Sequence, residues 1–278
     1  MDRERKKLDN ILTKISPKEL LGAELHGSEL IYNVIGFIPT SDFVDNAMLI
    51  SNLGYLISQK GLNTCIVDFK VFYPNLFQFL NVPPNKKGTG LIKLLKNDRV
   101  DFREEIQATK YDHLYLLSPS PQDLIEEYFD FSFDHIDRVI SNLKNMFDIV
   151  LIDVPNNPPL EFCLGAMKYC HMGFLTGSER VETIGNAMKL LDFASSVGIS
   201  TAKFNNIILT NVLNLTYDYK VFNDAGFKII AALPLVKLAY SRALEGRLYV
   251  KDNPIMDKYY YKNIEVIIKV LTNSDMGG

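Results

Sequence analysis

The chain alternates short apolar runs with segments in which apolar residues recur every three or four positions. The runs are rich in β-branched residues and continuously apolar, which is typical of strands buried on both faces of a parallel sheet. They span residues 31–38, 63–69, 113–119, 148–154, 171–177, 204–212 and 228–234. Segments with helical periodicity lie between them, at residues 42–60, 132–146, 180–196 and 262–271. This alternation predicts right-handed βαβ units, and so a doubly wound, mostly parallel sheet with helices on both faces.

Residues 1–30 follow a different pattern and are expected to form an N-terminal helical segment ahead of an α/β domain over residues 31–278. A basic cluster precedes apolar residues that share one helical face: Arg3, Arg5, Lys6 and Lys7, then Leu8, Ile11, Leu12 and Ile15. A basic amphipathic helix can bind anionic lipid or a partner. The pattern favours a helix packed on its own domain over a membrane-binding one.

The composition is that of a globular protein. Hydrophobic residues make up 47% of the 278 residues and charged residues 23%, which excludes a disordered chain. Thirty basic residues against 33 acidic ones give a net charge of −3, which argues against a protein that coats nucleic acid. The charged N-terminus lacks the apolar region of a secretory signal, and the three cysteines are scattered. We expect a cytoplasmic protein, or one held peripherally at a membrane.

Five segments occur in an order that resembles the MinD/ParA family of deviant Walker A ATPases, over roughly residues 32–272. They are SNLGYLISQKGLNTCIVDFKVFYPNL (51–76), GTGLIKLLKNDRVDFREEI (88–106), HLYLLSPSPQD (113–123), FDIVLIDVPNNPP (147–159) and IIAALPLVKLAYSRALEGRLYV (229–250). The resemblance implies a P-loop fold of the SIMIBI type. It also implies a nucleotide site at the strand ends and a homodimer formed around two nucleotides.

The phosphate loop departs from the family pattern K-G-G-x-G-K-T. The aligned positions are Ser41-Asp42-Phe43-Val44-Asp45-Asn46-Ala47. Ser41 and Asn46 replace the two lysines, and Ala47 replaces the threonine that binds Mg²⁺. Asp42 and Asp45 add carboxylates where a triphosphate would lie, and each repulsion costs about 4 kcal/mol at an effective dielectric of ~20. The sequence predicts a degenerate site without cofactor, in which ATP and Mg²⁺ bind only if the site is rebuilt.

The other positions of the family site are partly retained. Asp68 and Asp153 stand where the family has its strand-end and Walker B acids, and we favour for them a structural role as acceptors of backbone N–H groups. Lys70 replaces the acid that positions water in the family. We expect it to act as an internal cation, pairing with one or two of the acids that converge there. Asn211 falls where the family has an adenine-contacting asparagine, although a turn-capping role fits equally well.

Other sites are only weakly indicated. The four histidines are dispersed, without the spacing of metal ligands. Gly88-Thr89-Gly90 follows Lys86-Lys87 and could present backbone amides to a phosphate, but the family resemblance favours a plain turn into a helix.

These observations favour a catalytically inactive MinD/ParA-like protein, similar in kind to the TadZ/CpaE-like proteins. Such a protein would be a positioning or scaffolding component of a cytoplasmic or membrane-associated assembly of pilus, secretion or conjugation type. Its expected partners are a second copy of itself and the protein components of that assembly. One alternative is an ATPase with a rebuilt site that uses Lys70 as the phosphate cation. Another is a partitioning protein that binds DNA, which the net charge of −3 disfavours.

Overall fold

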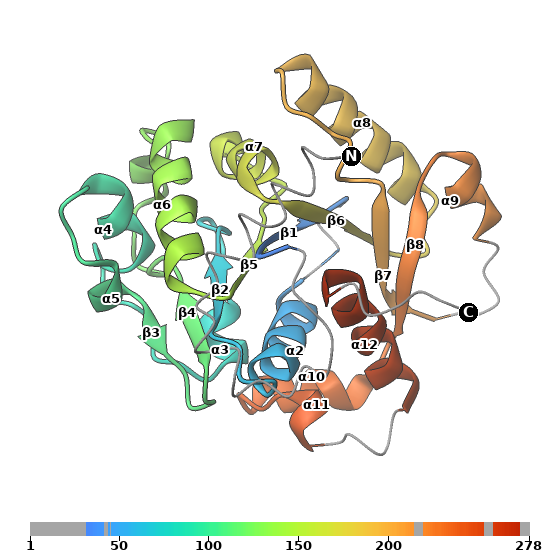
Figure 1. The fold of residues 1–278 in the computed structure, drawn as a ribbon, viewed down its shortest axis with the longest axis horizontal. Helices are drawn as coiled ribbons and strands as arrows, with labels where there is room; N and C mark the ends of the chain where they lie inside the picture. Colours follow the sequence, from blue (N-terminus) through green and yellow to red (C-terminus); the bar gives the residue numbers. More distant parts are fainter. Residues whose placement is uncertain (1–31, 42–43, 45, 214–218, 253–257, 273–278) are drawn as a thin grey trace, which may run out of the picture.

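An eight-stranded sheet forms the centre of the protein (Figure 1). The computed structural model describes residues 32–41, 44, 46–213, 219–252 and 258–272. The strands lie in the order β3-β4-β2-β5-β1-β6-β7-β8, and all pairs are parallel except β3 with β4. Their bounds are β1 (Val34–Pro39), β2 (Thr64–Asp68), β3 (Gln107–Ala108), β4 (Leu114–Leu117), β5 (Ile149–Asp153), β6 (Met172–Gly177), β7 (Asn206–Val212) and β8 (Lys228–Pro234).

Helices cover both faces of this sheet (Figure 1). Helices α4, α6, α7, α8 and α9 contribute to the core on one face, and helices α2, α3, α10, α11 and α12 to the core on the other. Their bounds are α2 (Ala47–Ser58), α3 (Leu76–Phe79), α4 (Leu91–Lys96), α5 (Phe102–Glu105), α6 (Phe133–Met146), α7 (Leu160–Tyr169), α8 (Glu182–Ser196), α9 (Lys220–Asp224), α10 (Lys237–Leu244), α11 (Tyr249–Asp252) and α12 (Lys258–Thr272), with a 3₁₀ turn, η2, at Ile125–Tyr128.

The central strand β1 shows why the apolar runs are continuous. Val34 and Ile38 belong to the core on one face, whereas Ile35 and Phe37 belong to the core on the other. Because successive side chains of a strand point to opposite faces, a strand with helices on both sides needs apolar residues at every position. All six residues of β1 are buried accordingly.

The predicted fold class is confirmed, and each of the seven predicted strands is present. Helix α7, the short helices α3, α5, α9, α10 and α11 and the two-residue strand β3 were not predicted. Helix α7 has no clear amphipathic pattern because its residues from Phe162 to Met167 are all buried. Helix α2 begins at Ala47, later than the expected residue 42, and α12 begins earlier, at Lys258. None of the described helices is long and apolar enough to cross a membrane. The expected N-terminal helical segment lies outside the described residues, so the boundary at residue 30 stays a prediction.

Close packing against the sheet depends on a glycine in β6. A Cβ atom at Gly173 would lie 2.0 Å from the ring of the fully buried Phe204, so this ring fits only over a residue without a side chain. Gly185 in α8 is the opposite case, because a Cβ atom there would meet nothing within 4 Å.

We expect Gly173→Ala to lower the free energy of unfolding by about 1–3 kcal/mol, because the added methyl group overpacks the core. Gly185→Ala is the matched control and should raise it by about 0.5–1 kcal/mol, since alanine is the better helix former and space is free. Urea unfolding of the two variants measures both values. Equal stabilities would contradict this account of the packing.

Candidate functional site at the carboxyl ends of the strands

Two fully buried carboxylates lie at the carboxyl ends of neighbouring strands. Asp68 ends β2 and Asp153 ends β5, and the two residues are in register. Strand β5 pairs with β2 on one side and with β1 on the other. Because β1 is parallel to β5 and ends at Pro39, the loop after Pro39 starts at the same edge of the sheet. Ligands of doubly wound sheets bind at this edge.

The Asp68 carboxylate organises the turn that follows β2. Its Oδ1 accepts a hydrogen bond from the backbone N–H of Lys70 at 3.0 Å. Its Oδ2 accepts two more, from the N–H groups of Asn75 at 3.0 Å and Leu76 at 3.2 Å. Burial raises the pKa of Asp68 to about 6, against the opposing effects of the Lys70 ammonium group and these three donors. These bonds agree with the structural role expected for Asp68.

The Lys70 ammonium group pairs with the other carboxylate. Its Nζ lies 2.9 Å from Oδ2 of Asp153, and the side chain of Lys70 is only 15% exposed while that of Asp153 is fully buried. This is the pairing expected of an internal cation. Asp42 and Asp45 lie outside the described residues, so their convergence on the same place stays a prediction.

The residue at the position of the phosphate-loop lysine is buried and uncharged. Asn46 is fully buried, and its Nδ2 donates a hydrogen bond to the carbonyl oxygen of Phe37 in β1 at 3.1 Å. Its side chain therefore bonds to the sheet backbone. The next residue, Ala47, is also fully buried and begins α2, and Ser41 accepts a backbone hydrogen bond from Val44 at 3.2 Å. None of these three side chains carries a positive charge that could neutralise a phosphate group. Ala47, the first residue of α2, has no hydroxyl group that could bind a metal ion.

An open pocket of about 470 Å³ lies beside the ion pair. Its volume is within the range of small-molecule sites. Lys70 is the only charged side chain among the described lining residues, and its charge is already paired with Asp153. The amide and aromatic residues of this pocket were not predicted from the sequence, although they lie within seven residues after the strand-end acids. The described lining residues are Pro39, Val44, Lys70, Tyr73, Asn75, Pro155, Asn156 and Asn157.

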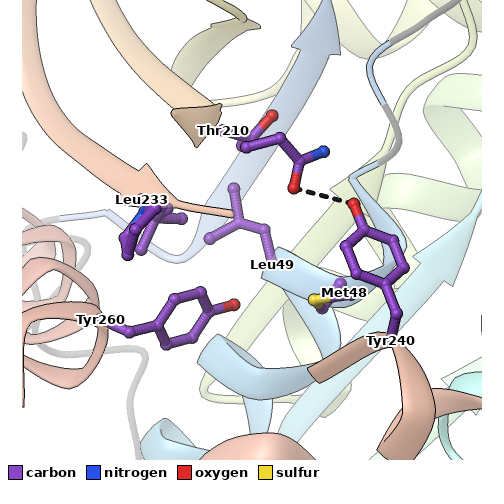
Figure 2. Close-up of a pocket in the computed structure, with 8 residues that line it drawn as sticks. Met48, Leu49, Thr210, Leu233, Tyr240 and Tyr260 are labelled. Atoms are coloured by element: carbon purple, nitrogen blue, oxygen red, sulfur yellow. Dashed lines mark hydrogen bonds between the residues drawn. The ribbon is translucent and has the colours of Figure 1, made fainter. Parts of the chain in front are cut away.

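Asn211 is not part of this pocket. It lines a second, much smaller cavity of about 20 Å³, together with Met48 and Leu49 from the first turn of α2 (Figure 2). The hydroxyl group of Tyr240 donates a hydrogen bond to Asn211 Oδ1 at 2.8 Å, drawn as the dashed line in Figure 2. The backbone of Asn211 is left-handed, with φ 55°, a conformation that asparagine tolerates in turns. This cavity has room for about one water molecule and is too small for a purine. The geometry therefore fits the turn-capping role of Asn211.

The glycine loop before α4 binds carboxylates of the protein itself. The N–H of Gly88 donates to Asp123 Oδ1 at 2.8 Å, and the N–H of Gly90 donates to Glu105 Oε2 at 2.6 Å. Lys93 forms an ion pair with Glu105. Because carboxylates of the protein already accept hydrogen bonds from these donors, the loop fits the plain turn that the family resemblance implies.

The described residues contain no group of three or more histidine, cysteine, aspartate or glutamate side chains that could hold a metal ion. All three cysteines are buried free thiols: Cys65, Cys163 and Cys170. Burial raises the pKa of Cys163 to about 12 and that of Cys170 to about 11, so these thiols are protonated at neutral pH.

No protein-family model matches this chain, and a comparison with curated proteins finds no significant relative. Solved structures of MinD and ParA proteins are nevertheless similar in fold. MinD from Pyrococcus horikoshii OT3, complexed with Mg-ADP, has a TM-score of 0.71 at 18% identity, and the match covers 88% of this chain and 99% of that one. MinD in the MinC:MinD complex of Aquifex aeolicus gives 0.73 at 16%, over 88% and 98%. A ParA family ATPase from Chlorobium tepidum TLS gives 0.72 at 16%, over 86% and 99%. The chain therefore has the MinD/ParA fold, as the motif order predicted.

We expect Lys70→Ala to lower the free energy of unfolding by about 3 kcal/mol, because it leaves the Asp153 carboxylate buried without its cation. Lys70→Asp should be more damaging still, since it adds a second negative charge. The double variant Lys70→Met, Asp153→Asn removes both charges and should recover most of the loss.

The matched control is Lys96→Ala, which removes the partner of Glu127 in an exposed ion pair, with side chains 49% and 31% exposed. It should change the free energy of unfolding by less than about 1 kcal/mol. Denaturant unfolding at neutral pH compares all four variants. A Lys70→Ala protein as stable as the parent would show that the pair does not hold the site.

Proposed function

We propose that this chain works without hydrolysing ATP, as a positioning or scaffolding component of a larger protein assembly. The observation that carries the proposal is the ion pair between Lys70 and Asp153, with Nζ and Oδ2 2.9 Å apart at the strand ends. In the MinD/ParA family, to which the motifs are similar, this region takes up phosphate and Mg²⁺. Here a side chain of the protein supplies the positive charge, so the acid is neutralised with no ligand bound.

The residues on α2 support the same proposal. Nucleotide binding in P-loop proteins depends on lysine and glycine N–H groups around the phosphates and on a hydroxyl group that binds Mg²⁺. Asn46 donates to the carbonyl oxygen of Phe37, and Ala47 has no hydroxyl group. A Mg-triphosphate would therefore find no lysine here to neutralise its phosphate groups and no hydroxyl group at Ala47 to bind its Mg²⁺.

Protein partners are the natural targets of such a component. The Aquifex aeolicus structure of the same fold is a complex of MinD with MinC. By analogy, we propose that this chain binds a second copy of itself and components of an assembly of pilus, secretion or conjugation type. In this respect it would be similar to the TadZ/CpaE-like proteins.

A second candidate function is an ATPase with a rebuilt site. The pocket of about 470 Å³ beside Lys70 favours it, because this volume suits a small ligand. In this case Lys70 would have to leave Asp153 and bind a phosphate group. The buried carboxylate would then need Mg²⁺ as its new partner.

A calorimetric titration with Mg-ATP separates the two functions. We expect no saturable heat at micromolar nucleotide and no phosphate release, because the cations of the phosphate loop are missing. Lys70→Asp, which restores an acid at the family position, should not restore activity. Saturable binding that is lost in Lys70→Ala would establish the rebuilt site instead.

We further expect the chain to self-associate through the carboxyl edge, and to do so without nucleotide. Phe72 and Tyr73 follow β2 at this edge and expose an aromatic pair, with side chains 43% and 72% exposed and ring centroids 4.9 Å apart. Exposed aromatic residues of this kind are typical of interface centres. Phe72→Ser should weaken the dimer, whereas Phe193→Ser on α8, at the same 43% exposure, should not.

Sedimentation velocity at several protein concentrations, with and without Mg-ATP, measures the association. A monomer under all conditions would contradict the proposed dimer. A dimer that forms only with Mg-ATP would favour the ATPase.

A further inference from the structure

The open pocket at the carboxyl edge is formed by the loops that follow three neighbouring strands. Strand β5 lies between β2 and β1 in the sheet, and the three strands are parallel. Strand β1 contributes its last residue, Pro39, to the pocket. The loop after β2 contributes Tyr73 and Asn75, and the loop after β5 contributes Asn156 and Asn157. The volume is about 470 Å³, and a segment of another chain can enter from the solvent side.

The charges around this pocket are already satisfied by groups of the protein. Lys70 is the only charged side chain among the described lining residues, and its Nζ lies 2.9 Å from Oδ2 of the buried Asp153. The neighbouring carboxylate, Asp68, accepts three backbone hydrogen bonds. A charged ligand would therefore meet no unpaired opposite charge on the described lining. The pocket favours an uncharged ligand, because an ion would lose its hydration without gaining a partner.

Amide side chains supply most of the hydrogen-bonding groups of the pocket. Asn156 and Asn157 are half-buried, and their side chains make no hydrogen bond with any described residue. Asn75 is positioned by its backbone, because its N–H donates to Asp68 Oδ2 at 3.0 Å. An asparagine amide group carries two N–H donors and one acceptor oxygen. The pocket can therefore donate hydrogen bonds to the carbonyl oxygens of a ligand.

An exposed aromatic ring and two proline rings form the apolar part of the lining. Tyr73 is 72% exposed, and its ring centroid lies 4.9 Å from that of Phe72. Pro39 and Pro155 are buried, and neither has an N–H group or a polar side-chain atom. The rings thus offer apolar surface to a ligand, and the neighbouring amides offer donors.

This combination of groups matches the chemistry of a proline-rich segment. Such a segment adopts the polyproline II conformation, which has no internal hydrogen bonds, so its carbonyl oxygens are free to accept bonds from a pocket. Its prolines have no N–H group, so the pocket does not need an acceptor for each residue. Proline-rich segments dock in aromatic-lined grooves, and they lose little conformational entropy because the helix is already formed.

We propose that this pocket binds a proline-rich segment of a partner protein. The proline rings of the segment pack against Tyr73, and its backbone carbonyl groups accept hydrogen bonds from the amides of Asn156 and Asn157. This inference rests on the function proposed above, in which no nucleotide occupies the carboxyl edge, and it gives the chemistry of one partner.

A neutral sugar fits this pocket less well, although aromatic rings and amides also suit sugars. The side chains of Pro39, Val44 and Pro155 offer no hydrogen bond to the hydroxyl groups of a sugar. Self-association is a separate contact that mutations can distinguish, because Phe72, the residue changed to test it, is not among the described lining residues.

Fluorescence anisotropy with the full chain tests this binding. The probes are four labelled dodecapeptides that repeat Pro-Pro-X, in which X is alanine, leucine, lysine or glutamate. We expect saturable binding of at least one of them, and none of four Gly-Ser-X peptides of the same length. Tyr73→Ala should weaken binding about tenfold, because it removes the ring surface. Asn156→Ala with Asn157→Ala should weaken it about 30-fold, through two lost hydrogen bonds.

The matched controls remove the same kinds of side chain away from the pocket. They are Tyr259→Ala on α12, where the tyrosine is 45% exposed, and Asn142→Ala on α6, where the asparagine is exposed. Both should leave peptide binding unchanged. Urea unfolding of all the variants should give the midpoint of the parent protein, which shows that a loss of binding is not a loss of folding.

The outcomes separate this inference from the proposed function. If none of the four proline-rich peptides binds and the calorimetry with Mg-ATP is also silent, the inference is wrong and the proposed function stands. Saturable binding of Mg-ATP would overturn both. Equal binding of the Gly-Ser-X peptides, equal losses in the control variants, or binding of maltoheptaose in place of the peptides would show that the pocket does not select a proline-rich segment.

Discussion

The carboxyl edge of this protein is organised around one buried ion pair, between Lys70 and Asp153. Two carboxylates end adjacent strands in register, and both are fully buried. Burying uncompensated charges costs several kcal/mol, so the sheet can end this way only if a cation or hydrogen-bond donors are present. Backbone N–H groups serve Asp68, and the Lys70 ammonium group serves Asp153.

The protein has the MinD/ParA fold, with its own set of side chains at the carboxyl ends of the strands. The strand-end acids of the motif pattern are still present, but Asn46 bonds to the backbone of β1 and Lys70 neutralises Asp153. A pocket remains beside the pair, lined mainly by amide, aromatic and proline side chains. This lining is consistent with the function that we propose, in which the chain binds protein partners and not a triphosphate.

The two edges of the sheet differ in how their charges are satisfied. At the carboxyl edge, the buried acids Asp68, Glu105 and Asp153 are paired with groups of the protein itself. At the amino edge, Lys168 and Lys203 contact aromatic rings and carbonyl groups, and neither forms an ion pair with a described carboxylate. The overall charge of −3 conceals this asymmetry, because it sums over both edges.

The sequence by itself determined the fold, since continuous apolar strands between helical segments fit only a sheet covered on both faces, as β1 illustrates. It also determined that the phosphate loop lacks its lysines, and it predicted that Lys70 would pair with an acid. Only the tertiary structure decided that Asp153 is the partner of Lys70, that Asn211 lies in a separate cavity, and that Lys203 reaches the carbonyl oxygens of Lys168 and Cys170. The physical reason is that strand order and register bring together side chains that are far apart in the chain, and local periodicity carries no information about either.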